Sequence, residues 1–277
     1  MNNLTLNKKL TIIAGPCSVD LDNTSDILKI AEIKVGNRFG RKQRAIFGTR
    51  VIGLKSRTSL NKDGKNMGID FQVFRNNINM LVQGKSVNDL NILPSVRIAK
   101  NIIKETCLLV AAEIMDPMSQ LPIFERMLPK NKVMIWNPAV NQLGWPVLNM
   151  AIFAKKNHWM IGLKNPKWFG DENLGQTTME KTWIGLSHYT GMNEPGLEEK
   201  LVLIHRGVDI YNKGDYRNLP VHQAAKRTKL ATKAKLFFDP SHIHGPKLRD
   251  SIVRATVEAM QMKIDEENFL YDGILIE

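Results

Sequence analysis

The sequence is poor in cysteine, and it lacks long apolar runs and internal repeats. Only two of its 277 residues are cysteines, Cys17 and Cys107, so we expect no disulfide framework and a reducing compartment, the cytoplasm. No apolar run approaches the roughly 18 residues that a membrane-spanning helix needs. The apolar stretch near the start is too short for a signal peptide. No linker is evident, so we expect one domain over residues 1–277.

Aromatic residues are also scarce, at 7%, whereas positive charge is abundant. The 39 Lys and Arg residues exceed the 27 Asp and Glu residues by 12. The densest basic cluster, RFGRKQR at 38–44, contains one aromatic residue and no groove-reading motif. A solvated basic face or a field that attracts phosphates is therefore favoured over nucleic-acid binding.

Short apolar runs recur along the chain, and amphipathic stretches of helical spacing separate them, for example at residues 24–35 and 246–262. Runs of this length, rich in Val and Ile, are typical of parallel strands that are buried on both faces. The predicted strands cover residues 11–15, 50–55, 108–114, 132–136, 159–164, 200–206, 234–240 and 271–277. Strand and helix alternate eight times, which predicts an α/β fold of the (β/α)8 TIM barrel type.

Two features depart from an idealised barrel. Residues 165–199 are too many for a simple crossover, so we expect an insertion after the fifth strand, with a helix near 176–187. The sequence ends at Glu277, on the eighth predicted strand, so the final outer helix is apparently missing; we expect either that the given sequence is short at its C-terminus or that a neighbouring subunit covers that flank.

Polar or ionisable residues follow almost every predicted strand. In a barrel of this type the carboxyl ends of the strands form one rim, where function resides. Each residue taken alone has an ordinary explanation: a rim Lys or Arg is usually solvated or paired, and a lone cysteine is usually a small buried side chain. The rim residues in chain order are Cys17, Arg50, Lys55, Arg57, Glu113, Asp116, Asn137, Asn141, Lys164, Arg206, Asp239, His242 and Glu277.

Taken together, these residues form two chemically sensible groups. Cys17, His242 and Glu277 follow the first, seventh and eighth strands, which are neighbours in a closed barrel, and their sulfur, nitrogen and oxygen donors suit a divalent transition metal. The second group is cationic and suits substrates that carry phosphate or carboxylate groups. Its members are Arg50, Lys55, Arg57, Lys164 and Arg206.

Seven short segments in chain order resemble the signature segments of the 3-deoxy-heptulosonate 7-phosphate (DAHP) synthases. With the 3-deoxy-octulosonate 8-phosphate synthases, these form a family of (β/α)8 enzymes that join phosphoenolpyruvate to a phosphorylated aldose. The resemblance runs from residue 11 to residue 277. The segments are IAGPCS at 13–18, LKSRTS at 54–59, AEIMD at 112–116, GLKN at 162–165, LIHRG at 203–207, DPSH at 239–242 and GILIE at 273–277.

The resemblance implies a role for individual residues. Cys17, His242 and Glu277 match the family's metal ligands, for a divalent ion of the Mn, Fe, Co or Zn type. Arg50, Lys164 and Arg206 match positions that hold phosphoenolpyruvate. Lys55, Arg57 and Thr58 match a Lys-Pro-Arg-Thr segment that lies between the substrates and contacts the aldose phosphate; Ser56 replaces the proline here.

The implied activity is a transferase of the DAHP synthase type, the first step of the shikimate pathway to aromatic amino acids. It would condense phosphoenolpyruvate with erythrose 4-phosphate in a homo-oligomer, a dimer or tetramer. Lys164, Lys55, Cys17 and His242 would be catalytic. Lys164 is the candidate for proton transfer because neighbouring cations lower the pKa of a lysine. Glu113 would either order the attacking water or pair with a rim cation.

Three departures from the family pattern keep alternatives open. Val140 stands where the family has an arginine for the phosphate of phosphoenolpyruvate. The family's fourth metal ligand, an aspartate beyond the last strand, has no counterpart in this sequence. A long regulatory extension is also absent, so feedback control by that route is not expected. The alternatives are an octulosonate-type synthase that uses a five-carbon aldose phosphate and a noncatalytic relative that binds phosphorylated ligands.

Overall fold

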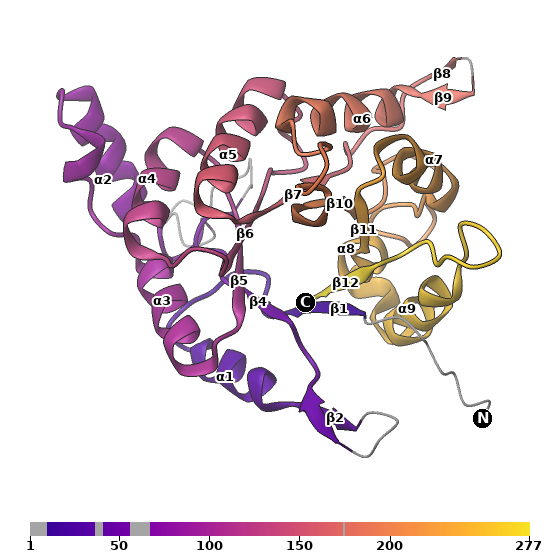
Figure 1. Ribbon diagram of the computed structural model, residues 1–277, viewed down its shortest axis with the longest axis horizontal. Coiled ribbons are helices and arrows are strands. Elements are labelled where there is room, and N and C mark those ends of the chain that lie inside the picture. The colour runs from indigo at the N-terminus through magenta and orange to yellow at the C-terminus, as the bar shows by residue number, and fades with distance from the viewer. Residues whose placement is uncertain (1–9, 37–40, 56–66, 174) are drawn as a thin grey trace.

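Eight parallel strands close into a barrel, and helices surround it (Figure 1). The computed structural model describes residues 10–36, 41–55, 67–173 and 175–277. Around the barrel the strands follow the order β1, β12, β11, β10, β7, β6, β5 and β4, and β4 pairs with β1 to close it. The barrel strands are β1 (Thr11–Ala14), β4 (Gly48–Arg50), β5 (Leu109–Glu113), β6 (Val133–Trp136), β7 (Met160–Lys164), β10 (Leu201–His205), β11 (Lys235–Phe238) and β12 (Gly273–Ile276).

Helices connect successive barrel strands along the outside of the ring (Figure 1). The alternation of parallel strands with outer helices confirms the predicted (β/α)8 barrel. The helices are α1 (Thr24–Glu32), α2 (Phe71–Val82), α3 (Pro94–Thr106), α4 (Pro117–Met127), α5 (Gly144–Asn157), α6 (Thr178–Thr190), α7 (His222–Thr232), α8 (Pro240–His244) and α9 (Ile252–Gln261). Within the described ranges, none of these helices combines the length and apolarity that crossing a bilayer requires.

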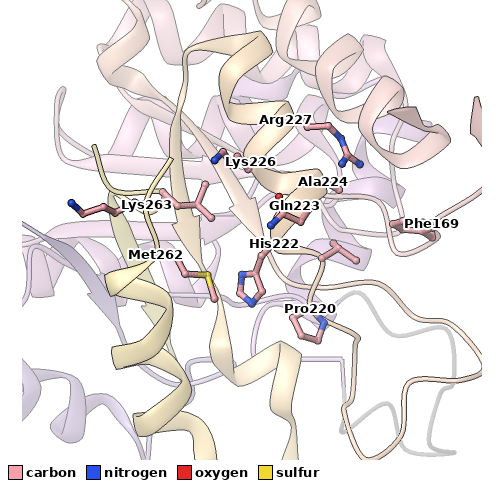
Figure 2. A pocket seen from close by; sticks show the side chains of 11 residues that line it. Phe169, Pro220, His222, Gln223, Ala224, Lys226, Arg227, Met262 and Lys263 are labelled. Carbon is pink, nitrogen blue, oxygen red and sulfur yellow. The ribbon is translucent and has the colours of Figure 1, made fainter. Parts of the chain in front are cut away.

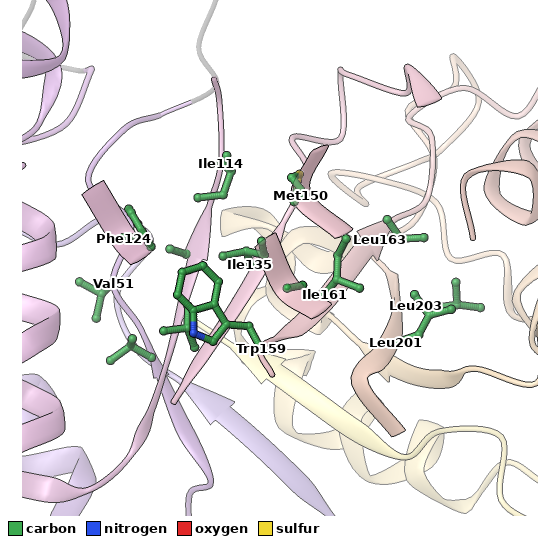
Figure 3. Packing of buried hydrophobic residues seen from close by; sticks show 14 of the residues in the cluster. Val51, Ile114, Phe124, Ile135, Met150, Trp159, Ile161, Leu163, Leu201 and Leu203 are labelled. Carbon is green, nitrogen blue, oxygen red and sulfur yellow. The ribbon is translucent and has the colours of Figure 1, made fainter. Parts of the chain in front are cut away.

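Alternation along the strands divides the core into an inner and an outer layer. On β5, Leu109 and Ala111 belong to the cluster inside the barrel, whereas Val110 and Ala112 belong to the cluster under the helices. Figure 3 shows part of this outer layer, with the indole of Trp159 among aliphatic side chains. Because both faces of each strand are covered, the strands read in the sequence as continuous apolar runs.

Several element boundaries differ from the sequence-based prediction. The second strand, expected at 50–55, is β4 at Gly48–Arg50. The first position of this strand requires glycine, because a Cβ at Gly48 would lie 2.9 Å from the Leu109 carbonyl oxygen on the neighbouring strand. The ladder ends at Val51, whose N–H donates to the Ala111 carbonyl at 2.8 Å. The chain then turns across the rim, so that Lys55 lies beyond the strand rather than at its end.

Two predicted helices are shorter than expected, and one helix was not foreseen. The helix expected at 24–35 ends at Glu32, and β2 (Lys34–Gly36) pairs with β3 (Lys42–Arg44) in a small hairpin. The helix expected at 246–262 is a 3₁₀ segment over Pro246–Ser251 followed by α9, because Leu248 has non-helical backbone angles. Helix α2, between β4 and β5, was not predicted.

The long segment after β7 contains both the crossover helix and an insertion. Helix α6 leads from β7 back to β10, as the regular barrel pattern requires. Before it, β8 (Glu172–Asn173) and β9 (Gln176–Thr177) form a hairpin that projects from the barrel (Figure 1). Thr177 then caps α6: its hydroxyl accepts from the Glu180 N–H, and the Glu180 carboxylate accepts from the Thr177 N–H.

Candidate functional site

A cavity of about 120 Å³ opens at the carboxyl ends of the barrel strands. Seven of the residues predicted from the sequence line it together with two aliphatic side chains and one further arginine. The lining residues are Cys17, Arg50, Ile52, Leu54, Lys55, Glu113, Lys164, Arg206, Arg217 and His242. The barrel thus gathers residues that are as far as 225 positions apart in the sequence, from Cys17 to His242. Two predicted substrate contacts, Arg57 and Thr58, lie outside the described residues.

Lys164 and Glu113 form a buried ion pair at the centre of this cavity. Trp136, on the strand between them, donates from its indole N–H to Glu113 Oε2 at 3.2 Å. Its ring also lies 5.4 Å from Lys164 Nζ, a separation typical of a cation–π contact. Burial lowers the pKa of Lys164, and the nearby Arg206 adds to that effect, although Glu113 opposes it. The lysine is therefore a better proton donor than a lysine in water.

Arg50 is held at the end of β4 by the carboxylate of Glu277. Its Nη1 lies 2.6 Å from Glu277 Oε1, and its side chain is 3% exposed. Burial opposes the charge of Arg50, but Glu277 and Asp239 together raise its pKa above the ordinary value. The same pairing keeps Glu277 ionised: burial would raise the pKa of that carboxyl, but Arg50 and His242 lower it. Both groups therefore remain charged at neutral pH.

Arg206 directly follows β10, and asparagine side chains fix its backbone. Its N–H donates to Asn165 Oδ1 at 2.8 Å, and its carbonyl oxygen accepts from Asn218 Nδ2 at 3.1 Å. Asn218 also donates to the His242 carbonyl at 2.9 Å, which ties the end of β10 to the start of α8. Burial lowers the pKa of Arg206, although the carboxylate of Asp239 opposes that shift. These contacts fix the backbone from which the Arg206 side chain reaches the cavity.

His242, on α8, lies between the carboxylates of Asp239 and Glu277. Its Nδ1 is 2.8 Å from Asp239 Oδ2 and 3.3 Å from Glu277 Oε1. Burial lowers the pKa of His242, which favours the neutral imidazole that a metal ligand requires. Burial alone would raise the pKa of Asp239, but His242 and the two arginines hold it well below its usual range. Asp239 is therefore an ionised neighbour that the predicted ligand set omitted.

The predicted metal ligands meet at this rim. Cys17 is an exposed free thiol that lines the cavity beside His242, and Glu277 contacts His242. Within residues 10–36, 41–55, 67–173 and 175–277, no three His, Cys, Asp or Glu side chains already surround a common point as metal ligands would. Glu277 is instead directed at Arg50, and the metal site stays a prediction.

Arg217 is a cavity residue that sequence reasoning missed. It lies on the loop between β10 and α7, far from any strand end, so the expectation that site residues follow the strands did not point to it. Val140, which stands at the position of the family's arginine, is 55% exposed and does not line the cavity. Arg217 thus brings a guanidinium to this cavity from a loop.

No protein-family model matches the chain, and no curated protein matches it either. Among solved structures, it is similar to phospho-2-dehydro-3-deoxyheptonate aldolase (DAHP synthase) from Thermotoga maritima, with a TM-score of 0.64 and 17% identity over 98% of this chain. The chain spans 60% of the length of that protein.

A second similar structure is a truncated form of 3-deoxy-D-arabino-heptulosonate 7-phosphate synthase from Thermotoga maritima. The TM-score is 0.61 and the identity is 17%, over 98% of this chain and 75% of the other. At this identity the likeness shows a shared barrel fold, on which different activities can be built.

Proposed function

We propose that this chain is a DAHP synthase-like transferase, which condenses phosphoenolpyruvate with erythrose 4-phosphate to give 3-deoxy-7-phosphoheptulonate and inorganic phosphate. Three independent features support the proposal. The seven sequence segments resemble that family in order, the barrel resembles solved DAHP synthases, and the cavity gathers several cations around a small volume. Fold similarity at 17% identity alone would not select a reaction.

The observation that carries this proposal is a set of unsatisfied buried donors. Nε of Arg50 and Nε of Arg206 are buried without a hydrogen-bond partner among the described residues. Buried guanidinium donors are normally paired, and an unpaired one has a large energetic cost. Both arginines line the same cavity, so an anion bound between them would satisfy both.

The cavity can hold phosphoenolpyruvate by its two anionic ends. Arg50, Arg206 and Lys164 would bind its phosphate and carboxylate, and Arg217 would add a contact from the solvent side. Lys55, with Arg57 and Thr58 of the neighbouring segment, would hold the aldose phosphate. Two substrates held in this way react as an oriented pair rather than by chance encounter.

The reaction forms one carbon–carbon bond and one carbon–oxygen bond, the latter to water, and it breaks the carbon–oxygen bond to the phosphate. The methylene carbon of phosphoenolpyruvate attacks the aldehyde carbon, and the aldehyde oxygen takes up a proton to become a hydroxyl group. Water adds at the carbon that bears the phosphate, and that adduct loses inorganic phosphate to leave a ketone. Lys164, whose pKa is lowered, would supply the proton, and its ion pair with Glu113 would hold its Nζ in place.

The rim residues fit a divalent metal ion. Cys17, His242 and Glu277 would supply sulfur, nitrogen and oxygen donors, and the pKa of His242 is lowered by burial, which favours the neutral imidazole that binds a metal. Asp239 is close enough to His242 to orient it or to join the donor set. When bound, such an ion would act as a Lewis acid on the aldehyde oxygen.

A paired assay tests the proposal. Purified protein is supplied with phosphoenolpyruvate, each of Mn²⁺, Fe²⁺, Co²⁺ and Zn²⁺ in turn, and either erythrose 4-phosphate or arabinose 5-phosphate. We expect phosphate release only when metal and erythrose 4-phosphate are both present. Release with the five-carbon sugar alone would assign the octulosonate-type reaction. Binding of phosphoenolpyruvate without release under any condition would indicate a noncatalytic relative.

A further inference from the structure

A second and larger cavity lies on the outside of the barrel. Its volume is about 590 Å³, and it opens between the first turn of α7 and the chain that leads into β12 (Figure 2). That volume is typical of pockets that bind small molecules. None of its residues lines the cavity at the strand ends. They are Phe169, Pro220, Val221, His222, Gln223, Ala224, Lys226, Arg227, Met262, Lys263 and Leu270.

The lining combines apolar and cationic residues. Six of the lining residues are apolar, whereas Lys226, Arg227 and Lys263 are cations and no carboxylate is present in the lining. Arg227 is already paired with Glu180, at 2.7 Å between Nε and Oε1. Lys263 donates to the Glu266 backbone carbonyl, and no carboxylate among the described residues forms an ion pair with it. The positive end of α7 adds to the same field.

His222 adds a hydrogen-bond donor to the lining. Nε2 of His205 accepts from the Val221 N–H at 3.1 Å, so the hydrogen of the neutral His205 ring is on Nδ1 and is donated to the Tyr271 hydroxyl at 2.7 Å. Tyr271 in turn donates its own hydrogen to Nδ1 of His222 at 2.7 Å. The hydrogen of neutral His222 is therefore on Nε2.

We propose that this cavity binds a small amphipathic anion, an apolar group that carries a carboxylate or a phosphate. The bound ligand restrains the loop over residues 206–221, which also forms a wall of the cavity at the strand ends. The proposal concerns binding alone, and it holds whether or not the chain catalyses the proposed reaction.

The loop over residues 206–221 physically joins the two cavities. Arg206 and Arg217 line the cavity at the strand ends, whereas Pro220 and Val221 line the outer cavity. The loop is folded on itself by an antiparallel bridge between Val208 and Leu219. A ligand packed against its last residues therefore acts on the same segment that carries both arginines.

Calorimetric titration with phenyl phosphate tests the binding site. In Arg206→Gln, which weakens phosphate binding at the strand ends, we expect phenyl phosphate to bind still. In the double variant Lys226→Glu and Lys263→Glu, binding should be about 10-fold weaker or more. The matched control, Lys100→Glu with Lys104→Glu on the exposed face of α3, makes the same charge change and should leave binding unchanged. Benzyl alcohol and inorganic phosphate should each bind more weakly than phenyl phosphate.

Three results would overturn the proposal. The first is that phenyl phosphate fails to bind the unmodified protein. The second is that its binding is lost in Arg206→Gln but kept in the Lys226 and Lys263 double variant. The third is that benzyl alcohol binds as tightly as phenyl phosphate. Hydrogen exchange tests the restraint: saturating phenyl phosphate should slow exchange of the Val208, Leu219 and Val221 amides, and the double variant should abolish that effect. Unchanged exchange across 206–221 in the bound protein would refute the link between the cavities.

Discussion

Lys164 at the end of β7 pairs with Glu113 at the end of β5, across the strand that separates them. Trp136, on that intervening strand, donates to Glu113 and places its ring beside the lysine. The side chains of Lys164 and Glu113 are 3% and 7% exposed, so neither charge is solvated. The pair is therefore a structural element as well as the proposed proton source, and its two roles can be measured separately.

The first prediction concerns the stability of the buried pair. Lys164→Met leaves the Glu113 carboxylate buried without its cation, and we expect the free energy of unfolding to fall by about 3–5 kcal/mol. Combining it with Glu113→Gln should recover most of that loss. Urea unfolding of Lys164→Met, Glu113→Gln and the double variant measures the coupling. Lys156→Met is the matched control, because its pair with Glu125 is on the surface and should contribute about 1 kcal/mol or less.

The second prediction concerns anion binding by the buried arginines. Arg206→Gln removes a preorganised guanidinium, and phosphoenolpyruvate should bind about 10- to 100-fold more weakly by calorimetry. Arg249→Gln changes an exposed arginine outside the cavity and should leave the affinity unchanged. Equal affinities in the two variants would remove Arg206 from the proposed substrate site.

The third prediction separates Arg217 from Val140. Arg217→Ala should raise KM for phosphoenolpyruvate about 10-fold with little change in kcat, because an exposed guanidinium contributes to binding more than to the chemical step. Val140→Ala should change neither constant, because Val140 does not line the cavity. Steady-state kinetics measures KM and kcat for both variants, and a larger change in Val140→Ala than in Arg217→Ala would contradict this assignment.

The fourth prediction tests the sulfur ligand without an activity assay. Loaded with Co²⁺, the protein should show a thiolate-to-metal charge-transfer absorption if Cys17 supplies the sulfur ligand as proposed. Cys17→Ser should lose that absorption. Cys107→Ser provides the matched control, since Cys107 is also an exposed free thiol but follows α3 at the opposite ends of the strands. An absorption that survives in Cys17→Ser would exclude it as a ligand.

The fifth prediction concerns pH and His222. Burial, reinforced by the nearby His244, lowers the pKa of His222 from 6.5 to about 4. The unfolded state therefore binds more protons between these values, so this group stabilises the fold above pH 6.5 and its contribution is lost as the pH falls toward 4. The loss amounts to at most about 3 kcal/mol. The other groups that face His222 are His205 and Tyr271.

Urea unfolding of His222→Gln across the same pH range measures this contribution. Glutamine does not titrate, so the stability of the variant should depend less steeply on pH than that of the unmodified protein. Asp70 changes stability in the opposite direction, because burial raises its pKa to about 6. Both proteins contain Asp70, so the difference between their slopes isolates His222. Identical slopes would show that His222 does not titrate as proposed.

The sequence by itself determined the barrel and most of its rim. Eight apolar runs separated by amphipathic helices specify a parallel sheet, because only strands covered on both faces can be apolar throughout. Once the strands are placed, their carboxyl ends follow, and Cys17, Arg50, Lys164, Arg206 and His242 are found there. Local pattern was enough for these residues because each lies within a few positions of a strand.

Only the tertiary structure decided which side chains interact and which distant loops take part. That Glu113 pairs with Lys164, and Glu277 with Arg50, depends on side-chain directions across the closed barrel. Arg217 enters the cavity from a loop whose sequence carries no periodic signal. The outer cavity arises from three segments that meet only after folding, since packing between elements remote in sequence is not encoded in local pattern.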